Sequence, residues 1–190
     1  MPEVRRVCVY CGSRPGARPV YAEAARRLGE RLAAEGIGLV TGGGRVGLMG
    51  VVADAVLSGG GRAVGVIPRA LADREVSHDG MTELHVVETM HQRKAAMADL
   101  ADAFVALPGG LGTLEEIAEA LTWAGLGIHA KPCALLDVGG YYGPLVGWLD
   151  HAVAEGFVSA EARAALTVEA DPDALVDRLL AARPGPAAGC

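Results

Sequence analysis

The chain of 190 residues is 51% hydrophobic and has a formal net charge of −6 at pH 7. A chain of this length and apolar content can bury one sizeable core, which excludes a disordered protein. The acidic balance argues against a broad surface for nucleic acid or membrane, because such surfaces need clustered basic residues. The sequence shows neither a signal-peptide pattern nor an apolar run near the roughly 18 residues of a membrane span, so we expect a cytoplasmic protein.

Short apolar runs alternate with helical stretches along the chain. The expected strands are 6–10, 38–41, 63–67, 84–88, 104–107 and 133–137, the last being the final strand. The expected helices are 20–35, 46–57, 91–100, 113–125, 143–155 and 172–182. Apolar runs without polar alternation are typical of parallel strands buried on both faces.

These alternating units predict an α/β fold, a single-domain Rossmann-like, doubly wound parallel sheet with helices on both faces. We expect one nucleotide-binding domain over 1–182. The Pro-, Gly- and Ala-rich segment 183–190 is expected to be a flexible tail.

The glycine-rich segment 103–116, AFVALPGGLGTLEE, is the most informative part of the chain. An apolar strand ends there in Pro108, passes through glycines and opens into a helix expected to start at Thr113. Such a turn directs bare backbone N–H groups, at the positive end of the helix dipole, toward a ligand that is usually a phosphate. Simple turn chemistry is the alternative reading. We interpret the loop as the phosphate cradle of an enzyme that acts on a phosphorylated small molecule.

Glu116 has two readings that the residues leave open. Thr113 and Glu116 match a capping box, in which the two side chains satisfy each other's backbone N–H groups. Alternatively, the Glu116 carboxylate acts on a ligand held by the loop before it. Glu115, the neighbouring carboxylate, is expected to be solvated.

Arg93 and Lys94 form an adjacent basic pair in the central region. The pair is either a solvated helix start or a means of neutralising an anion, in which Arg offers a planar fork and Lys a point charge.

Two further motifs need a reading of their own. Residues 42–47, GGGRVG, satisfy G-x-G-x-x-G, but they follow the second strand and the next strand ends without an acid for a ribose hydroxyl. A tight turn or a contribution to a nucleotide pocket therefore fits better than an NAD site. Cys8 and Cys11 match C-x-x-C without a second ligand pair, so we read them as small core residues.

Several motifs in order resemble one known family. CVYCGS, GGGRVGLMG, MHQRK, PGGLGTLEE and TWAGLGIHAKPCALLDVGGYY are together similar to the "lonely guy" family of cytokinin riboside 5′-monophosphate phosphoribohydrolases, over about Arg6 to Phe157. The resemblance implies hydrolysis of the N-glycosidic bond of such nucleotides, and of AMP as a further substrate, releasing an adenine-type base and ribose 5-phosphate. It implies no metal or organic cofactor, and a homodimer or a larger assembly of dimers; the acidic charge balance separately predicts no nucleic-acid or membrane partner.

The resemblance also implies site residues. Arg93 and Glu116 match the family's catalytic residues. The implied substrate contacts are Glu75, Arg93, Lys94, Gly109, Gly110, Leu111, Gly112, Thr113, Leu114, Glu115, Glu116 and Thr122.

The implied reaction fits the chemistry of these residues. Cleavage of the N-glycosidic bond develops positive charge on the ribose, which a nearby carboxylate can stabilise while it orients or deprotonates a water. We expect Arg93 to hold the phosphate or the ribose hydroxyls and to keep Glu116 ionised, because a nearby cation lowers the pKa of a carboxyl group.

Two alternatives remain. A pyridoxal-phosphate-dependent lysine decarboxylase needs a lysine for a Schiff base, and the chain has only Lys94 and Lys131. A non-catalytic nucleotide or molybdenum-cofactor carrier of the same fold is the other alternative, and the intact Arg93 and Glu116 pair favours the enzyme.

Overall fold

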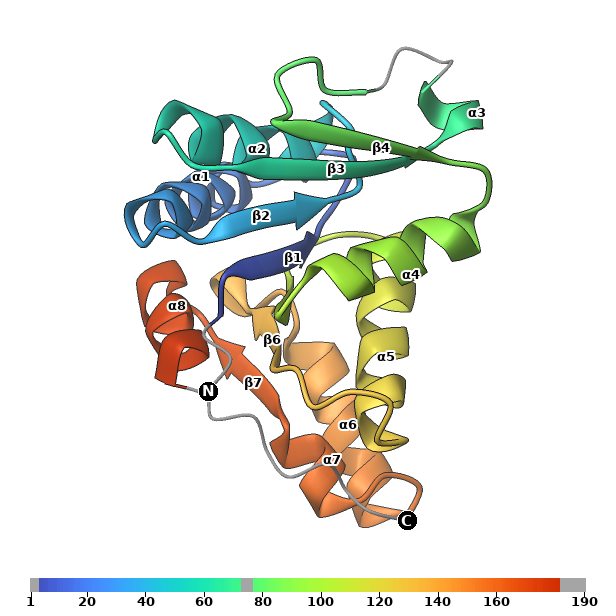
Figure 1. Cartoon of the computed structure of the whole chain (residues 1–190). Coiled ribbons are helices and arrows are strands. Elements are labelled where there is room, and N and C mark those ends of the chain that lie inside the picture. Colours follow the sequence, from blue (N-terminus) through green and yellow to red (C-terminus); the bar gives the residue numbers. More distant parts are fainter. Residues whose placement is uncertain (1–3, 73–76, 182–190) are drawn as a thin grey trace.

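The computed structural model describes residues 4–72 and 77–181, and its strands form one parallel sheet (Figure 1). The sheet has seven strands in the order β4-β3-β2-β1-β5-β6-β7, and every neighbouring pair is parallel. The strands are β1 (Arg6–Tyr10), β2 (Gly38–Thr41), β3 (Ala63–Pro68), β4 (Glu83–Val87), β5 (Ala103–Ala106), β6 (Cys133–Leu136) and β7 (Leu166–Glu169). The predicted Rossmann-like, doubly wound α/β fold is confirmed.

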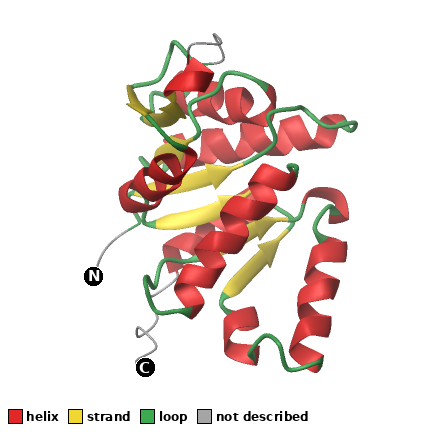
Figure 2. Ribbon diagram, turned by 90° about the vertical axis from the view of Figure 1, so that its right-hand side faces the viewer, coloured by secondary structure: helices red, strands yellow, loops and turns green. Residues whose placement is uncertain are grey.

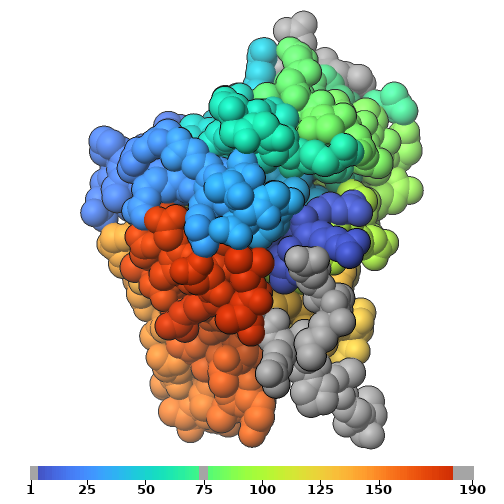
Figure 3. Space-filling view, turned by 60° about the vertical axis from the view of Figure 1, so that its left-hand side comes forward, coloured from blue at the N-terminus to red at the C-terminus, as the bar shows by residue number. Residues whose placement is uncertain are grey.

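Helices cover both faces of the sheet, as Figure 2 shows from the side. The first group, α1 (Pro19–Ala34), α2 (Gly47–Ser58) and α8 (Pro172–Ala181), buries its apolar residues in one core cluster. In the second group, α4 (Met90–Leu100), α5 (Leu111–Gly125) and α6 (Gly143–Ala154) pack on the opposite cluster. Helix α8 lies against α1 in this first layer (Figure 3).

Successive side chains of β1 point to opposite faces of the sheet, so this strand contributes to both core clusters. Val7 and Val9 belong to the first cluster, whereas Cys8 and Tyr10 belong to the second. Cys11 is also buried, and this burial raises the pKa of its thiol to about 12. Among the described residues, no group of three or more His, Cys, Asp or Glu side chains could hold a metal ion. The two cysteines are therefore core residues, as predicted.

Adjacent strands β1 and β5 send their following helices to opposite faces of the sheet. The loop after β1 leads to α1 on the first layer, and the loop after β5 leads to α5 on the second. Between two such strands the loops diverge and leave a crevice at the carboxyl ends of the strands, which is where ligands bind in open α/β sheets. The glycine-rich loop that the sequence singled out lies at this switch point.

The structure corrects three expectations about the strands and helices. Residues 133–137 are not the final strand, because β7 follows and pairs with β6 at the sheet edge. The short helices α3 (Arg69–Ala72) and α7 (Ala160–Ala164) and the 3-10 turn η1 (Val138–Gly140) were not expected. Helix α5 begins at Leu111 rather than at Thr113. The expected tail 183–190 lies outside the described residues, and no helix in the described part is long and apolar enough to cross a bilayer.

Candidate active site at the switch point

A cleft of about 530 Å³ opens between the loops that follow β1 and β5. Its walls come from three segments, with one residue from α2. They are Gly12, Ser13, Arg14, Pro15, Gly16 and Tyr21; Leu48; and Pro108, Gly109, Gly110, Leu111 and Tyr141. The two loops are joined directly, because the Gly12 N–H donates to the Pro108 carbonyl at 3.1 Å.

The start of α5 offers free hydrogen-bond donors to this region. Gly110 is the N-cap, and no side chain caps the helix. The first helical hydrogen bond runs from the Leu114 N–H to the Gly110 carbonyl. Within the described residues, the amides from Gly110 to Thr113 therefore have no protein acceptor. Unpaired amides at the positive end of a 15-residue helix are a natural anion site.

The glycines of this loop differ in how much space a side chain would have at each position. A side chain at Gly109 would overlap the Thr113 hydroxyl and lie 2.6 Å from Thr113 Cβ, so the backbone there rests directly on the buried threonine. A Cβ at Gly110 or Gly112 would meet nothing within 4 Å. The first glycine is thus required by packing, and the other two leave open space in front of the amides.

Arg93 on α4 and Glu116 on α5 meet from two different helices, and neither of them lines the cleft. Arg93 Nη1 lies 3.8 Å from Glu116 Oε1, and each side chain is about one-tenth exposed, at 11% and 10%. The Arg93 Nε–H also donates to the Val66 carbonyl at 3.2 Å, which holds the guanidinium against the carboxyl end of β3. A buried ion pair with spare donors and acceptors can still bind a polar ligand.

Burial sets the acidity of Glu116. Loss of hydration raises the pKa of its carboxyl group to about 6, and the Arg93 charge opposes this rise without cancelling it. Arg93 thus lowers this pKa, as expected, but burial outweighs its charge and the net value is raised. The group is nevertheless mostly ionised at pH 7, so it can act as a base near neutrality.

The capping-box reading of Glu116 is wrong. Because α5 starts at Leu111, Glu116 lies within the helix and not at the N3 position, so it cannot reach back to an N-cap amide. A capping box does occur at α4, where Thr89 and Gln92 bond each other's backbone. The T-x-x-Q pattern in the sequence signals it. That cap fixes the helix start immediately before Arg93.

The glycines of the GGGRVG segment serve packing around the site. A side chain at Gly42 would overlap the Arg93 guanidinium, with Cζ only 2.8 Å away. Gly47 has a φ of 62° and its Cα faces the Ser13–Arg14 backbone, which only glycine accommodates easily. The segment is thus a tight turn that also supports the pocket, and Gly42 is a site residue that sequence reasoning missed.

Lys94 is already engaged by carboxylates of α5. Its ammonium contacts Glu115 and lies 3.1 Å from Glu119 Oε2. These pairings, the Glu115 hydrogen bond first, raise the pKa of Lys94 and keep it charged. Glu115 is partly exposed, yet it is paired rather than simply solvated. Lys94 therefore faces α5 and not an open anion site.

The remaining predicted contacts fall in three places. Leu111 and Leu114 are exposed on α5. Thr122 lies further along the same helix, where its hydroxyl donates to the Ala118 carbonyl at 2.7 Å. Glu75 lies outside the described residues.

Known proteins are similar to this chain in sequence and in fold. A family model described as "Possible lysine decarboxylase" matches residues 49–179. The chain is 52% identical over 175 residues to a cytokinin riboside 5′-monophosphate phosphoribohydrolase of Arabidopsis thaliana, covering 92% of this chain and 81% of that protein. It is 51% identical over 168 residues to a phosphoribohydrolase of the same name from Rhodococcoides fascians, covering 88% and 85%.

A solved structure is also similar. The molybdenum cofactor carrier protein of Chlamydomonas reinhardtii superposes with a TM-score of 0.72 at 25% identity, over 94% of this chain and 99% of that one. The identity to the phosphoribohydrolases is about twice as high and extends over most of both chains. This chain therefore belongs to the "lonely guy" family of cytokinin riboside 5′-monophosphate phosphoribohydrolases.

Proposed function

We propose that the protein hydrolyses the N-glycosidic bond of cytokinin riboside 5′-monophosphates, and of AMP, to the free base and ribose 5-phosphate. One observation carries the proposal: Glu116, which pairs with Arg93, lies on the same helix whose first amides have no protein acceptor among the described residues. A phosphate on those amides brings the attached ribose toward the carboxylate. The names of the relatives support the same reaction.

Each residue has a role in this proposal. The amides from Gly110 to Thr113 bind the 5′-phosphate. Glu116, with a pKa of about 6, stabilises the positive charge that develops on the ribose and activates the attacking water. Arg93 binds a phosphate or ribose oxygen with the donors it does not use on the Val66 carbonyl.

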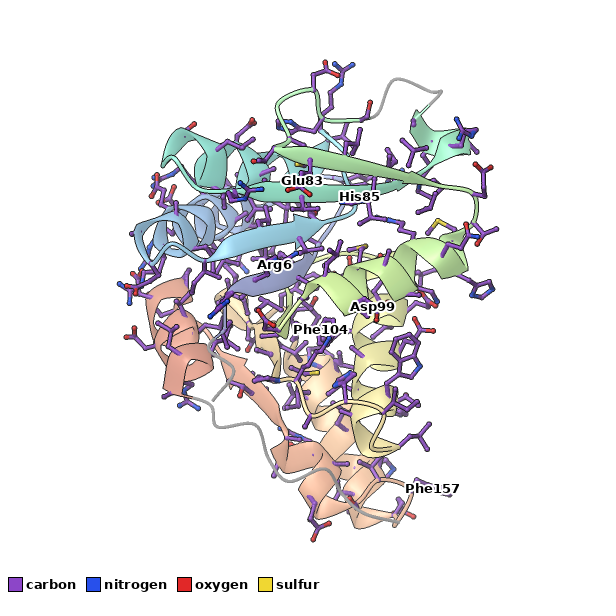
Figure 4. The ribbon with its side chains drawn as sticks, in the orientation of Figure 1. Arg6, Glu83, His85, Asp99, Phe104 and Phe157 are labelled. Atoms are coloured by element: carbon purple, nitrogen blue, oxygen red, sulfur yellow. The ribbon has the colours of Figure 1, made fainter. Side chains whose placement is uncertain are left out.

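Lysine decarboxylation is a poor fit to both lysines of the chain. Lys94 is paired with Glu115 and Glu119. The Lys131 ammonium donates to the Ala98 carbonyl at 2.7 Å and lies 5.9 Å from the centre of the Phe104 ring, which Figure 4 shows in the interior. A Schiff base requires an uncharged, accessible amine. The carboxylates beside Lys94 keep it charged, and the Lys131 Nζ is engaged by a backbone carbonyl.

The direct test is release of free base. Purified protein is incubated with AMP and with isopentenyladenosine 5′-monophosphate, and the base is quantified by chromatography. We expect release from the wild-type protein and loss of it in Glu116→Gln. Tight nucleotide binding without any release would favour a carrier and contradict the proposal.

The proposed enzyme is a cytoplasmic homodimer, with larger assemblies of dimers as an extension. Large apolar side chains are exposed along α5 and the segment after it, and on and beyond α6. They are Leu111, Leu114, Leu126, Ile128, Trp148 and Phe157. Phe157, 87% exposed, lies at the lower end of the molecule in Figure 4. Light scattering after size exclusion tests the dimer, and Ile128→Asp is expected to weaken it.

A further inference from the structure

Two consecutive tyrosines bond the backbone on either side of Pro108, Tyr142 at the end of the strand and Tyr141 in the glycine loop. The Tyr142 hydroxyl donates to the Leu107 carbonyl at 2.6 Å, and the Tyr141 hydroxyl donates to the Gly109 carbonyl. The two bonds flank Pro108, at the point where β5 turns into the loop. Positive φ angles at Gly139 and Gly140, 60° and 76°, allow the tight turn that presents both rings.

The two tyrosines have different surroundings. Tyr142 is buried, and its backbone N–H is fixed by Asp137 Oδ1 at 2.6 Å. Tyr141 is 40% exposed and lines the cleft together with the glycine loop. Its ring packs edge-on against Tyr21 at 5.7 Å and against Tyr142 at 5.1 Å between ring centres. Aromatic packing therefore holds the Tyr141 ring in place without its hydroxyl.

The bond to the Gly109 carbonyl determines the direction of an amide. The C=O of Gly109 and the N–H of Gly110 belong to one peptide plane and point in opposite directions when the peptide is trans. Because both flanking residues are glycines, few steric barriers oppose rotation of this plane. A donor on the carbonyl removes that freedom and keeps the Gly110 N–H with the other free amides of the α5 start.

We infer that Tyr141 is a positioning residue for substrate, whose hydroxyl orients the Gly109–Gly110 peptide so that the loop is preorganised for the 5′-phosphate. The inference rests on the proposed function, since it assigns the phosphate to the amides of this loop. It predicts that the Tyr141 hydroxyl acts on recognition of the phosphate and not on bond cleavage or on recognition of the base.

The test compares Tyr141→Phe with Tyr142→Phe, the same loss of one hydroxyl at neighbouring positions. For Tyr141→Phe we expect KM for the nucleotide to rise roughly five- to tenfold, the size of one lost hydrogen bond, with kcat within about twofold. Inhibition by ribose 5-phosphate should weaken by the same factor, and inhibition by free adenine should not change.

The control variant should behave differently. Tyr142→Phe leaves a buried carbonyl without its donor, so we expect Tm to fall by roughly 3–8 °C while KM stays near the wild-type value. An unchanged KM in Tyr141→Phe, an equal loss of adenine inhibition, or the same KM change in both variants would overturn the inference. Failure of the wild-type protein to release base would instead contradict the proposed function, so the two failures are distinguishable.

Discussion

Arg93 Nη1 and Glu116 Oε1 lie 3.8 Å apart, although the two side chains come from different helices that follow different strands. The separation is longer than a hydrogen bond, so the pair is coupled by charge without being closed onto itself. Both groups keep polar atoms for a ligand. This is the arrangement expected of a cation and a carboxylate that share one substrate.

Removing the Glu116 charge should separate catalysis from stability. Since no capping box involves this residue, we expect Glu116→Gln to fold normally and to lose activity by about 100-fold or more, the usual contribution of a general base. Glu119→Gln is the matched control on the same helix and should retain activity within a few fold. Steady-state kinetics and a thermal melt of both variants check this. Near-wild-type turnover in Glu116→Gln would end the catalytic assignment.

The raised pKa of Glu116 also makes stability depend on pH. The folded value of about 6 exceeds the ordinary 4.5, so between these pH values the folded protein binds more protons than the unfolded chain. Stability should therefore rise as pH falls from 6 to 4.5, and the ionised group costs up to about 2 kcal/mol above pH 6. Glu116→Gln should lack this contribution. Urea unfolding of both proteins at pH 5 and pH 8 measures it, and an equal difference at both values would contradict the assignment.

Activity should have an acidic limb for the same reason. The carboxylate form of Glu116 is populated above about pH 6, so kcat/KM should fall tenfold per pH unit below that value. The Glu115 charge raises the pKa of Glu116, and Lys94, which Glu115 engages, lowers it. Glu115→Gln removes the charge that raises the pKa of Glu116 and frees Lys94 from its pairing with Glu115. The pKa of Glu116 should therefore fall, and the acidic limb should move to lower pH. A profile from pH 5 to pH 8 shows the shift, and a limb that moves upward would refute this electrostatic account.

The sequence predicted the sheet better than it predicted the site. The strands β1, β3 and β5 are fully buried apart from Arg6, and their apolar composition therefore predicts them. The edge strand β7 is only half buried, and its residues LTVE carry no such signal. The start of α5 was placed too late because Thr113 is a better N-cap by composition than Gly110, whose extended backbone takes that position.

The direction of the Glu116 pKa could not be predicted from the residues. The motifs identify Arg93 as a cation that lowers the pKa of Glu116. The desolvation that raises this pKa more strongly arises only from tertiary packing, which the sequence does not show. The same limit applies to Gly42. Gly42 leaves space for the guanidinium of Arg93, which comes from a helix far along the chain. The GGGRVG pattern does not indicate this contact.

Gly42 leaves the space that the Arg93 guanidinium occupies, so a side chain at this position should disturb Arg93. The Cβ of Gly42→Ala would overlap the guanidinium, which can move because it is the end of a flexible side chain. We expect kcat/KM to fall by about 10- to 100-fold through displacement of Arg93, with a smaller loss of stability. Gly147→Ala, on α6 with nothing within 4 Å of the added Cβ, is the control and should leave activity unchanged. A fully active Gly42→Ala would show that the position of Arg93 is not critical.

Alanine scanning of the glycine loop should separate packing from binding. At Gly109 the added methyl would overlap the buried Thr113 hydroxyl, so Gly109→Ala should lower Tm by several degrees, because overpacking costs roughly 1–3 kcal/mol. At Gly110 the methyl enters open space, so Gly110→Ala should melt near the wild-type temperature. If the 5′-phosphate occupies that space, Gly110→Ala raises KM for AMP and weakens inhibition by inorganic phosphate, whereas inhibition by adenine is retained. Wild-type KM in a stably folded Gly110→Ala would place the phosphate away from these amides.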